Sequence, residues 1–247
     1  MKKIDYRGAV IPIILLLVWS VSAQQKWIDA AFLPPLSTVW DEFVKGWQSG
    51  ELRENVLASL IRNLAGFIAG GLVGVSAGLV LGLNTWVDRF FSPTLNAIKH
   101  VAVFAWIPLM IMWFGHGELS KVIFIALVVF YPVFFNTYDG IKNVPHRLYE
   151  VADIFQLSAT HRFFKVLLPA AAPSIFAGLN IALVFSWMAT VGAEYFFVSD
   201  LGVVNPILDG QNVFKMEVVL YGMVVIAVIG LILSKAAQFF ENYNLRW

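Results

Sequence analysis

Apolar residues in this chain gather in long runs that short polar segments separate. Six runs reach or approach the roughly twenty residues that a helix needs to cross a bilayer core. They lie at residues 9–23, 64–83, 101–114, 122–138, 175–193 and 218–237. Polar stretches at 24–62, 139–168 and 194–217 connect them. The pattern predicts one all-α integral membrane domain of about six transmembrane helices, spanning residues 1–247.

The first apolar run permits two interpretations. Lys2, Lys3 and Arg7 precede it, and Val21-Ser22-Ala23 ends it. A basic start, an apolar middle and a small-residue end are also the pattern of a cleaved secretory signal. We expect a retained first span, and the signal peptide is the alternative.

The composition narrows the class of protein. Apolar residues make up 59% and charged residues 13%, against about 25% charged in soluble domains. A net charge of +1 argues against nucleic acid as a partner. Cysteine is absent and the four histidines are scattered, so we expect no metal site. No Gly-Lys-Ser or Gly-Lys-Thr phosphate loop occurs, and we therefore expect no ATP hydrolysis by this chain itself.

The positive charges orient the spans. If the N-terminus is cytoplasmic, eleven of the 17 Lys and Arg residues lie on the cytoplasmic side and six lie outside. An excess of Lys and Arg on the cytoplasmic side is the rule in membrane proteins. We expect both termini and residues 139–168 in the cytoplasm, and residues 24–62 and 194–217 outside.

Glycines form a regular row in the second span. They recur at every fourth position and share one helix face: Gly66, Gly70, Gly74, Gly78 and Gly82. Helices in lipid associate by close backbone packing, which such a row permits. We expect helix packing within the chain, and a sliding contact beside a pathway is the alternative.

Two prolines interrupt the third and fourth spans. Pro108 and Pro132 cannot donate a hydrogen bond to the carbonyls of Phe104 and Val128. In lipid these carbonyls must find other partners or face a cavity. The two spans therefore either kink against their neighbours or line a hydrated pathway.

Two charged residues lie at the external ends of spans. Glu194 ends the fifth span and Arg62 precedes the second. A charge near a span end can reach the interface, whereas a deeper one faces a cavity or a partner charge. We interpret Glu194 as a gating or structural residue with Arg62 as its candidate counter-ion, and interfacial anchoring is the alternative for both.

The segment between the fourth and fifth spans carries the most specific pattern. Its apolar residues fall near helical spacing, and Glu150 and Asp153 precede a run of basic residues. We expect a short amphipathic helix whose start these carboxylates complement. The segment resembles the signature loop of the permease subunits of bacterial ATP-binding-cassette (ABC) importers, with matches at Ala152, Leu168 and Pro169 besides Glu150.

The segment also departs from that signature. Val151 replaces an alanine, and Gln156 stands where the signature has glycine. Glycine suits a left-handed turn that closes a helix. Gln156 therefore either adopts that costly turn or avoids it, through a longer helix or a turn shifted to Leu157 or Ser158.

Further motifs are similar to the permeases that import nitrate, taurine and aliphatic sulfonates. They occur in the same order from residue 32 onward: Phe32-Leu33-Pro34-Pro35, Ala58-Ser59-Leu60-Ile61-Arg62, Ile107-Pro108-Leu109, the run from Trp113 to Lys121, and Ala193-Glu194 with Leu201-Gly202. Permeases this similar also carry cyanate, bicarbonate and vitamin precursors, which are the alternative solutes.

The resemblance implies a type I ABC-importer permease of the bacterial inner membrane that passes a small anionic solute. It implies a homodimer, two ATPase subunits that bind ATP and Mg²⁺, an external substrate-binding protein, and membrane lipid as partners, with no cofactor on this chain. The residues that it assigns to a cytoplasmic coupling helix are Glu150, Val151, Ala152, Asp153, Ile154, Phe155, Gln156, Ser158 and Pro169. The candidate path or gate residues, interpreted from the sequence pattern itself, are Arg62, Pro108, Pro132 and Glu194.

Two other classes fit the sequence less well. A membrane enzyme needs acids, bases or metal ligands that converge within the spans. A proton-driven transporter needs ionisable residues there, and Glu194 is the one candidate that the spans offer.

Overall fold

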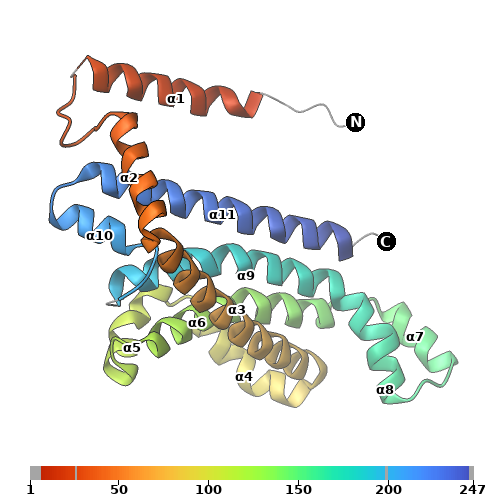
Figure 1. Ribbon diagram of the computed structural model, residues 1–247. Helices are drawn as coiled ribbons and strands as arrows, with labels where there is room; N and C mark the ends of the chain where they lie inside the picture. The colour runs from red at the N-terminus through yellow and green to blue at the C-terminus, as the bar shows by residue number, and fades with distance from the viewer. Residues whose placement is uncertain (1–6, 26, 198–199, 245–247) are drawn as a thin grey trace. The chain divides into compact units, whose positions relative to one another are not determined.

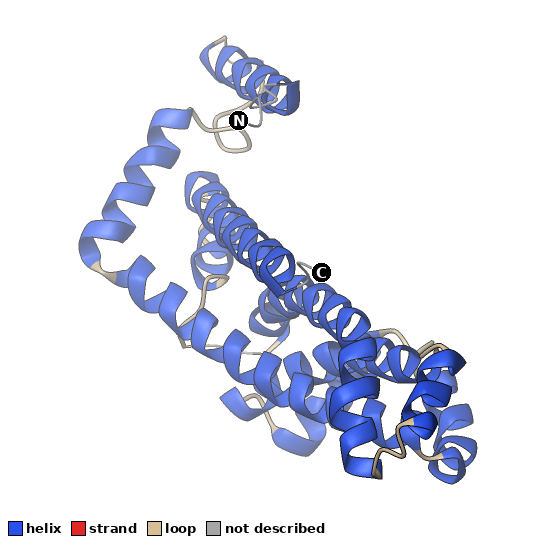
Figure 2. Ribbon diagram, turned by 90° about the vertical axis from the view of Figure 1, so that its right-hand side faces the viewer, coloured by secondary structure: helices blue, strands red, loops and turns tan. Residues whose placement is uncertain are grey.

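The computed structural model describes residues 7–25, 27–197 and 200–244, with side chains from 10 to 239 within these ranges. The described residues are helical, with no strand among them (Figures 1 and 2). The elements are α1 (Arg7–Gln24), α2 (Leu36–Ser49), α3 (Glu51–Leu83), α4 (Thr85–Ile98), the 3-10 turn η1 (Val103–Trp106), α5 (Ile107–Phe114), α6 (Glu118–Lys142), α7 (His146–Ile154), α8 (Ala159–Arg162), the π-helical turn η2 (Phe163–Leu167), α9 (Leu168–Phe196), α10 (Asn205–Asn212) and α11 (Met216–Asn244).

Four helical segments of the described chain are long and apolar enough to cross a membrane. They are Glu51–Leu83, Glu118–Lys142, Ala159–Phe196 and Met216–Phe239. Residues 101–114, predicted as a short span that Pro108 interrupts, count as a fifth span only together with α4, which meets the η1–α5 segment at an angle of 96°. The first predicted span appears as the shorter apolar helix Val10–Gln24. The predicted total of six spans is therefore reached only if the bent pair and the shorter helix are each counted as a span.

The helix α3 joins two elements that the sequence predicts as separate. Gly50 ends α2 in the left-handed conformation (φ 84°), and Glu51 and Glu54 then begin α3, where negative charge favours a helix N-terminus. Arg62 and Asn63 do not interrupt α3, because each is only 4% exposed and has polar partners inside the protein. The polar boundary that the sequence pattern predicts is thus buried within a continuous helix.

The helix α4 lies in a stretch that the hydrophobic pattern leaves outside the spans. The Asn84 side chain caps it by accepting hydrogen bonds from the amides of Trp86 (3.0 Å) and Val87 (3.3 Å). Asp88 then ties α4 to α6 through the Tyr138 hydroxyl (2.8 Å) and the Lys142 ammonium (2.8 Å).

The chain divides into two compact units, one of residues Met1–Leu57 with Leu201–Ala227, and the other of Ala58–Asp200 with Val228–Trp247. In the first, the Trp19 indole donates to the Pro34 carbonyl (2.9 Å), and the Gly202 amide donates to the Asn55 side chain (2.9 Å). These bonds hold the segment after α1 and the segment before α10.

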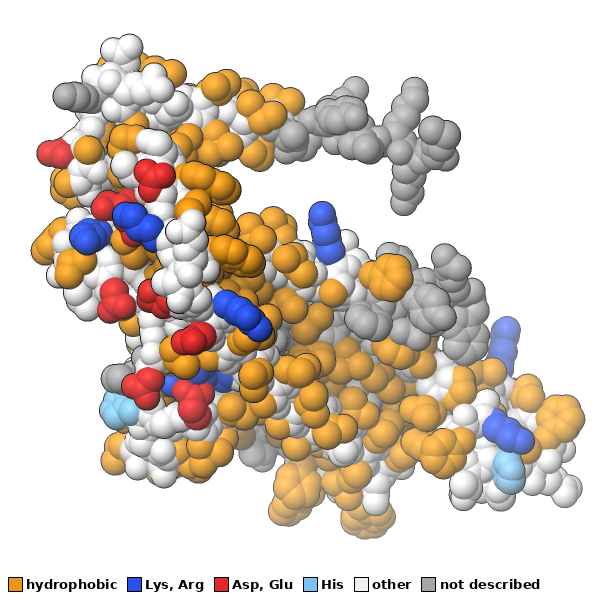
Figure 3. Space-filling model, viewed as in Figure 1, with side chains coloured by type: hydrophobic (Ala, Val, Ile, Leu, Met, Phe, Trp, Pro, Cys, Tyr) orange, Lys and Arg blue, Asp and Glu red, His pale blue; other side chains and the backbone are white. Residues whose placement is uncertain are grey.

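The second unit is built around α6, which packs against α9 (Figure 1). Phe124, Ile125, Val129 and Val133 on α6 are fully buried. On the face that Figure 3 shows, apolar side chains cover much of the surface, as suits contact with lipid tails.

The glycine row of α3 lies against α6. A Cβ atom added at Gly66 would lie 2.5 Å from Ile125, one at Gly74 3.0 Å from Val133, and one at Gly82 2.9 Å from Ile141. Glycines spaced four residues apart on α3 thus contact side chains that are also spaced four residues apart on α6. The backbones approach closely because the glycines have no side chains to hold them apart.

Two adjacent glycines provide a matched test of this packing. A Cβ at Gly70 would lie 2.8 Å from Val129 Cβ and even closer to the Ala126 carbonyl, whereas one at Gly71 would have its nearest contact at 3.8 Å, with Leu179. Overpacking a tight core costs about 1–3 kcal/mol. We expect Gly70→Ala to lower the thermal unfolding midpoint in detergent and Gly71→Ala to leave it unchanged or raise it. Equal midpoints for the two variants would contradict the close contact.

Candidate functional site

The resemblance predicts a helix over Glu150–Thr160, and the structure shows α7, which begins and ends earlier. It begins at His146, directly after Pro145, because proline suits the first turn and cannot continue a helix backward. It ends at Ile154, and Gln156 adopts the left-handed conformation (φ 50°). Of the three possibilities for Gln156, the structure therefore shows the costly turn, and neither a longer helix nor a shifted turn occurs.

Two backbone bonds close α7 in a Schellman motif. The Leu157 amide donates to the Ala152 carbonyl and the Gln156 amide to the Asp153 carbonyl, each at 3.0 Å. Ala152 is fully buried. These contacts fix the end of α7, so its side chains point in defined directions.

Apolar side chains on α7 face solvent. Ile154 is 77% exposed, Phe155 71% and Val151 47%. They therefore do not pack back onto the spans. In Figure 3 the end of the molecule that holds α7 and α8 shows apolar, basic and histidine side chains side by side. An exposed apolar group beside charges is typical of a protein contact surface.

The sequence predicted that the carboxylates of Glu150 and Asp153 complement the N-terminus of this helix. This prediction is wrong. Glu150 lies in the second turn, because α7 begins four residues before it, and it contacts His146 Nδ1 at 3.2 Å. Asp153 lies in the last turn, where the helix dipole disfavours an anion. Its charge is paired instead with Arg162 of α8.

After a short non-helical stretch, a continuous helical segment runs from α8 through η2 into α9. The Ser158 hydroxyl caps α8 by accepting from the His161 amide (3.4 Å). The turn η2 has π geometry, which inserts an extra residue, and π turns often occur at functional sites. Pro169 follows in the first turn of α9, where the fixed φ of proline suits a helix.

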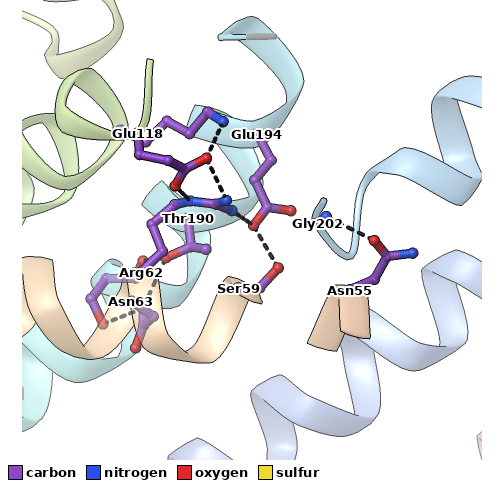
Figure 4. Close-up of polar contacts among 10 residues, drawn as sticks. Asn55, Ser59, Arg62, Asn63, Glu118, Thr190, Glu194 and Gly202 are labelled. Carbon is purple, nitrogen blue, oxygen red and sulfur yellow. Dashed lines mark hydrogen bonds and ion pairs between the residues drawn. The ribbon is translucent and has the colours of Figure 1, made fainter. Parts of the chain in front are cut away.

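A second polar constellation joins three helices of the same unit. Arg62 on α3 pairs with Glu194 on α9, and its Nε atom donates to Glu118 of α6 at 2.7 Å (Figure 4). Lys121 also pairs with Glu118 (2.7 Å), and the Ser59 hydroxyl donates to Glu194 (2.5 Å). The side chains of Arg62 and Glu194 are 4% and 0% exposed. Interfacial anchoring is therefore wrong for both residues.

Hydrogen bonds extend this constellation along α3 and α9. The Asn63 amide donates to the Ser186 hydroxyl (3.1 Å) and the Thr190 hydroxyl (2.9 Å). Sequence reasoning missed these residues, although Ser186, Thr190 and Glu194 recur at every fourth position and so predict one polar stripe on a helix. Burial of charges and amides is stable here because they are bonded to one another.

The two prolines lie in different environments. Pro108 lies in the first turn of α5, and the Phe104 carbonyl accepts from the Ile107 amide, so no bond is broken there. A kink caused by Pro108, one of the two alternatives, is therefore absent. Pro132 lies within α6 and, with Val128, lines a cavity of about 460 Å³ between α6, α9 and residues 99–104. The Pro132 carbonyl accepts from the Asn136 side chain (2.8 Å).

No group of three or more metal-ligating side chains occurs in the part of the chain that the structure describes. The arrangement instead offers an exposed contact helix at one end of the second unit and a buried ion network among α3, α6 and α9.

Comparison with known proteins gives three findings. Residues 70–245 match the family model of the binding-protein-dependent transport system inner membrane component. The putative aliphatic sulfonates transport permease protein SsuC of Bacillus subtilis is 32% identical over 98% of this chain and 87% of its own length. The taurine transport system permease protein TauC of Escherichia coli is 30% identical over 95% and 86%.

The fold also resembles a solved structure, that of the methionine ABC transporter MetNI in inward-facing conformations. The TM-score is 0.67, and the match covers 79% of this chain and 96% of the other at 15% identity. A likeness at this identity concerns the fold alone.

The buried ion network gives a stability prediction. Removing one partner of a buried pair leaves an uncompensated charge and costs about 3–5 kcal/mol. We expect Glu194→Ala to lower the unfolding midpoint strongly. Glu42→Ala, which removes the surface partner of Lys45, is the matched control and should change it little. Similar midpoints for the two variants would show that the Arg62–Glu194 pair contributes nothing to stability.

Proposed function

Because the chain belongs to the family of binding-protein-dependent transport system inner membrane components, we propose that it forms half of the translocation path of an ATP-driven importer for small organic sulfonates. The other half is a second copy of the chain. ATP and Mg²⁺ bind to two ATPase subunits on the cytoplasmic side, and a binding protein delivers the solute from outside. The observation that carries the proposal is the exposed apolar face of α7.

The helix α7 is suited to transmit force. Ile154 and Phe155 are exposed enough to insert into an apolar groove of an ATPase, as amphipathic helices do in other complexes. The Schellman motif and the Asp153–Arg162 pair hold α7 to the helical path that leads into α9. A displacement of α7 therefore acts on α9, which carries Glu194 near its other end. This linkage supports a bundle with two arrangements that the ATPases bias.

The proposed solute class follows from the relatives. SsuC and TauC are named for aliphatic sulfonates and taurine, and all of these solutes carry a sulfonate anion. Nitrate, cyanate, bicarbonate and vitamin precursors are the alternatives. Uptake of radiolabelled taurine and ethanesulfonate by proteoliposomes that hold the complete importer distinguishes these solutes from nitrate.

Coupling through α7 can be tested by truncating its aromatic side chain. Aromatic anchors at interfaces contribute on the order of 2 kcal/mol, which corresponds to about a 30-fold loss of affinity. We expect Phe155→Ala to reduce ATPase co-purification by this order and to leave the permease folded by size exclusion. Phe214→Ala, at an 88% exposed phenylalanine of the loop between α10 and α11, is the matched control. Normal ATPase binding and solute-stimulated hydrolysis by Phe155→Ala would remove α7 from the coupling role.

The orientation can be tested by labelling single cysteines, since the chain has none of its own. His161 and Asp209 are both exposed. The excess of Lys and Arg places His161 in the cytoplasm and Asp209 outside. We expect an impermeant maleimide to label Asp209→Cys in intact cells and to label His161→Cys only after permeabilisation. The reverse result would overturn the proposed orientation.

A further inference from the structure

The cavity beside Pro132 lies within one compact unit and is lined mainly by aromatic and aliphatic side chains. Its volume of about 460 Å³ falls in the range of roughly 300–1,000 Å³ that is typical of small-molecule sites. It is open on one side, and three segments line it, namely residues 99–104, α6 and α9. Of the site residues predicted from the sequence, Pro132 is the one that lines this cavity.

Most of the cavity wall is apolar and aromatic. Phe104, Phe124, Phe135 and Phe185 contribute rings, and Tyr131 adds a ring with a hydroxyl. Along α6 the lining runs from Phe124 to Phe135, which at about 1.5 Å per residue is a length of roughly 16 Å. A cavity of this shape accommodates a hydrocarbon chain that lies along the helix.

One cation lies at one end of this apolar wall. Among the described residues that line the cavity, Lys99 is the charged one. Its Nζ atom lies 5.0 Å from the centre of the Phe135 ring. The ammonium also donates to Asn96 Oδ1 at 2.7 Å, which holds it in place. Lys99 is exposed to solvent, so its ammonium keeps further hydrogen-bonding capacity for an anion.

We infer that this cavity is a binding site for aliphatic sulfonates, with the sulfonate on Lys99 and the hydrocarbon chain against the aromatic wall. The inference rests on the proposed function and narrows its solute class to sulfonates that carry an apolar chain. A bare inorganic anion such as nitrate fits this site poorly. It would lose hydration against apolar walls and gain a single cationic partner.

The test described below also distinguishes two other possible occupants of the cavity. A neutral lipid tail or a second copy of the chain would use the aromatic wall but would have no need of Lys99. The combination of one cation and an extended apolar wall favours an amphiphilic anion over either of them.

Photolabelling of the complete chain in lipid nanodiscs tests the site without any transport step. The probe is an eight-carbon alkanesulfonate with a diazirine at the chain end, and labelled residues are identified by mass spectrometry. We expect labels on the α6 and α9 residues that line the cavity. Free 1-octanesulfonate should suppress them, and each methylene removed from the competitor should weaken it by about fourfold.

Charge recognition is tested with two variants of α4 and its C-terminal end. Lys99→Gln should reduce labelling by about tenfold, as expected for a hydrogen bond to a charged group. Arg89→Gln removes an exposed charge that does not line the cavity, and it should label like the wild type. The inference is overturned if Lys99→Gln labels normally, if 1-octanol competes as well as 1-octanesulfonate, or if the label lies outside the cavity.

Uptake by the reconstituted importer separates the two proposals. If taurine and ethanesulfonate are imported but the cavity is not labelled, the proposed function stands and the cavity site falls. If the cavity is labelled in a Lys99-dependent way but no sulfonate is imported, the proposed function falls and the site remains as a binding site.

Discussion

Close contact between the backbones of α3 and α6 is the constraint on which the second unit depends. In lipid, apolar side chains gain little by leaving one hydrocarbon environment for another, so helices associate by dispersion contacts at short range. The glycines of α3 allow this short range because they have no side chains, and Ile125, Val129 and Val133 fill the space opposite them. α6 presents another side to α9, where Gly178 lies against Asn136 in the same manner. The central position of α6 thus follows from small residues on both neighbours.

Tight packing explains why a buried ion network can persist in this unit. Arg62, Glu194 and Lys121 are nearly inaccessible to solvent, and each has an opposite charge within the protein. Such networks give little net stability but penalise every arrangement that separates their members. The network therefore favours one register of α3, α6 and α9, and a change in that register requires several bonds to break together.

The segment that holds α7 combines a rigid end with an apolar exposed face. Gln156 adopts a left-handed turn that glycine would adopt at lower cost. The two Schellman bonds and the Asp153–Arg162 pair hold α7 in this geometry. The aromatic cavity is lined in part by α9, the helix that continues from α8 and η2.

The sequence by itself determined the all-α membrane class, the four long spans and the identity of the loop that resembles a coupling segment. These properties are local, since they depend on runs of apolar residues and on fixed spacing within one segment. The period of the glycine row also followed from sequence, because one helix face is defined by position alone.

Only the tertiary structure decided which groups meet. Arg62 and Glu194 are separated by 132 positions, and no local pattern predicts that Glu118 and Lys121 join them. For the same reason, the sequence did not predict the break between α4 and α5. It also did not predict that α3 continues through Arg62 and Asn63. A polar residue ends a helix or lies within it according to whether a distant helix supplies its partner. Likewise, the cavity with Lys99 at one end exists only because three separate segments line it.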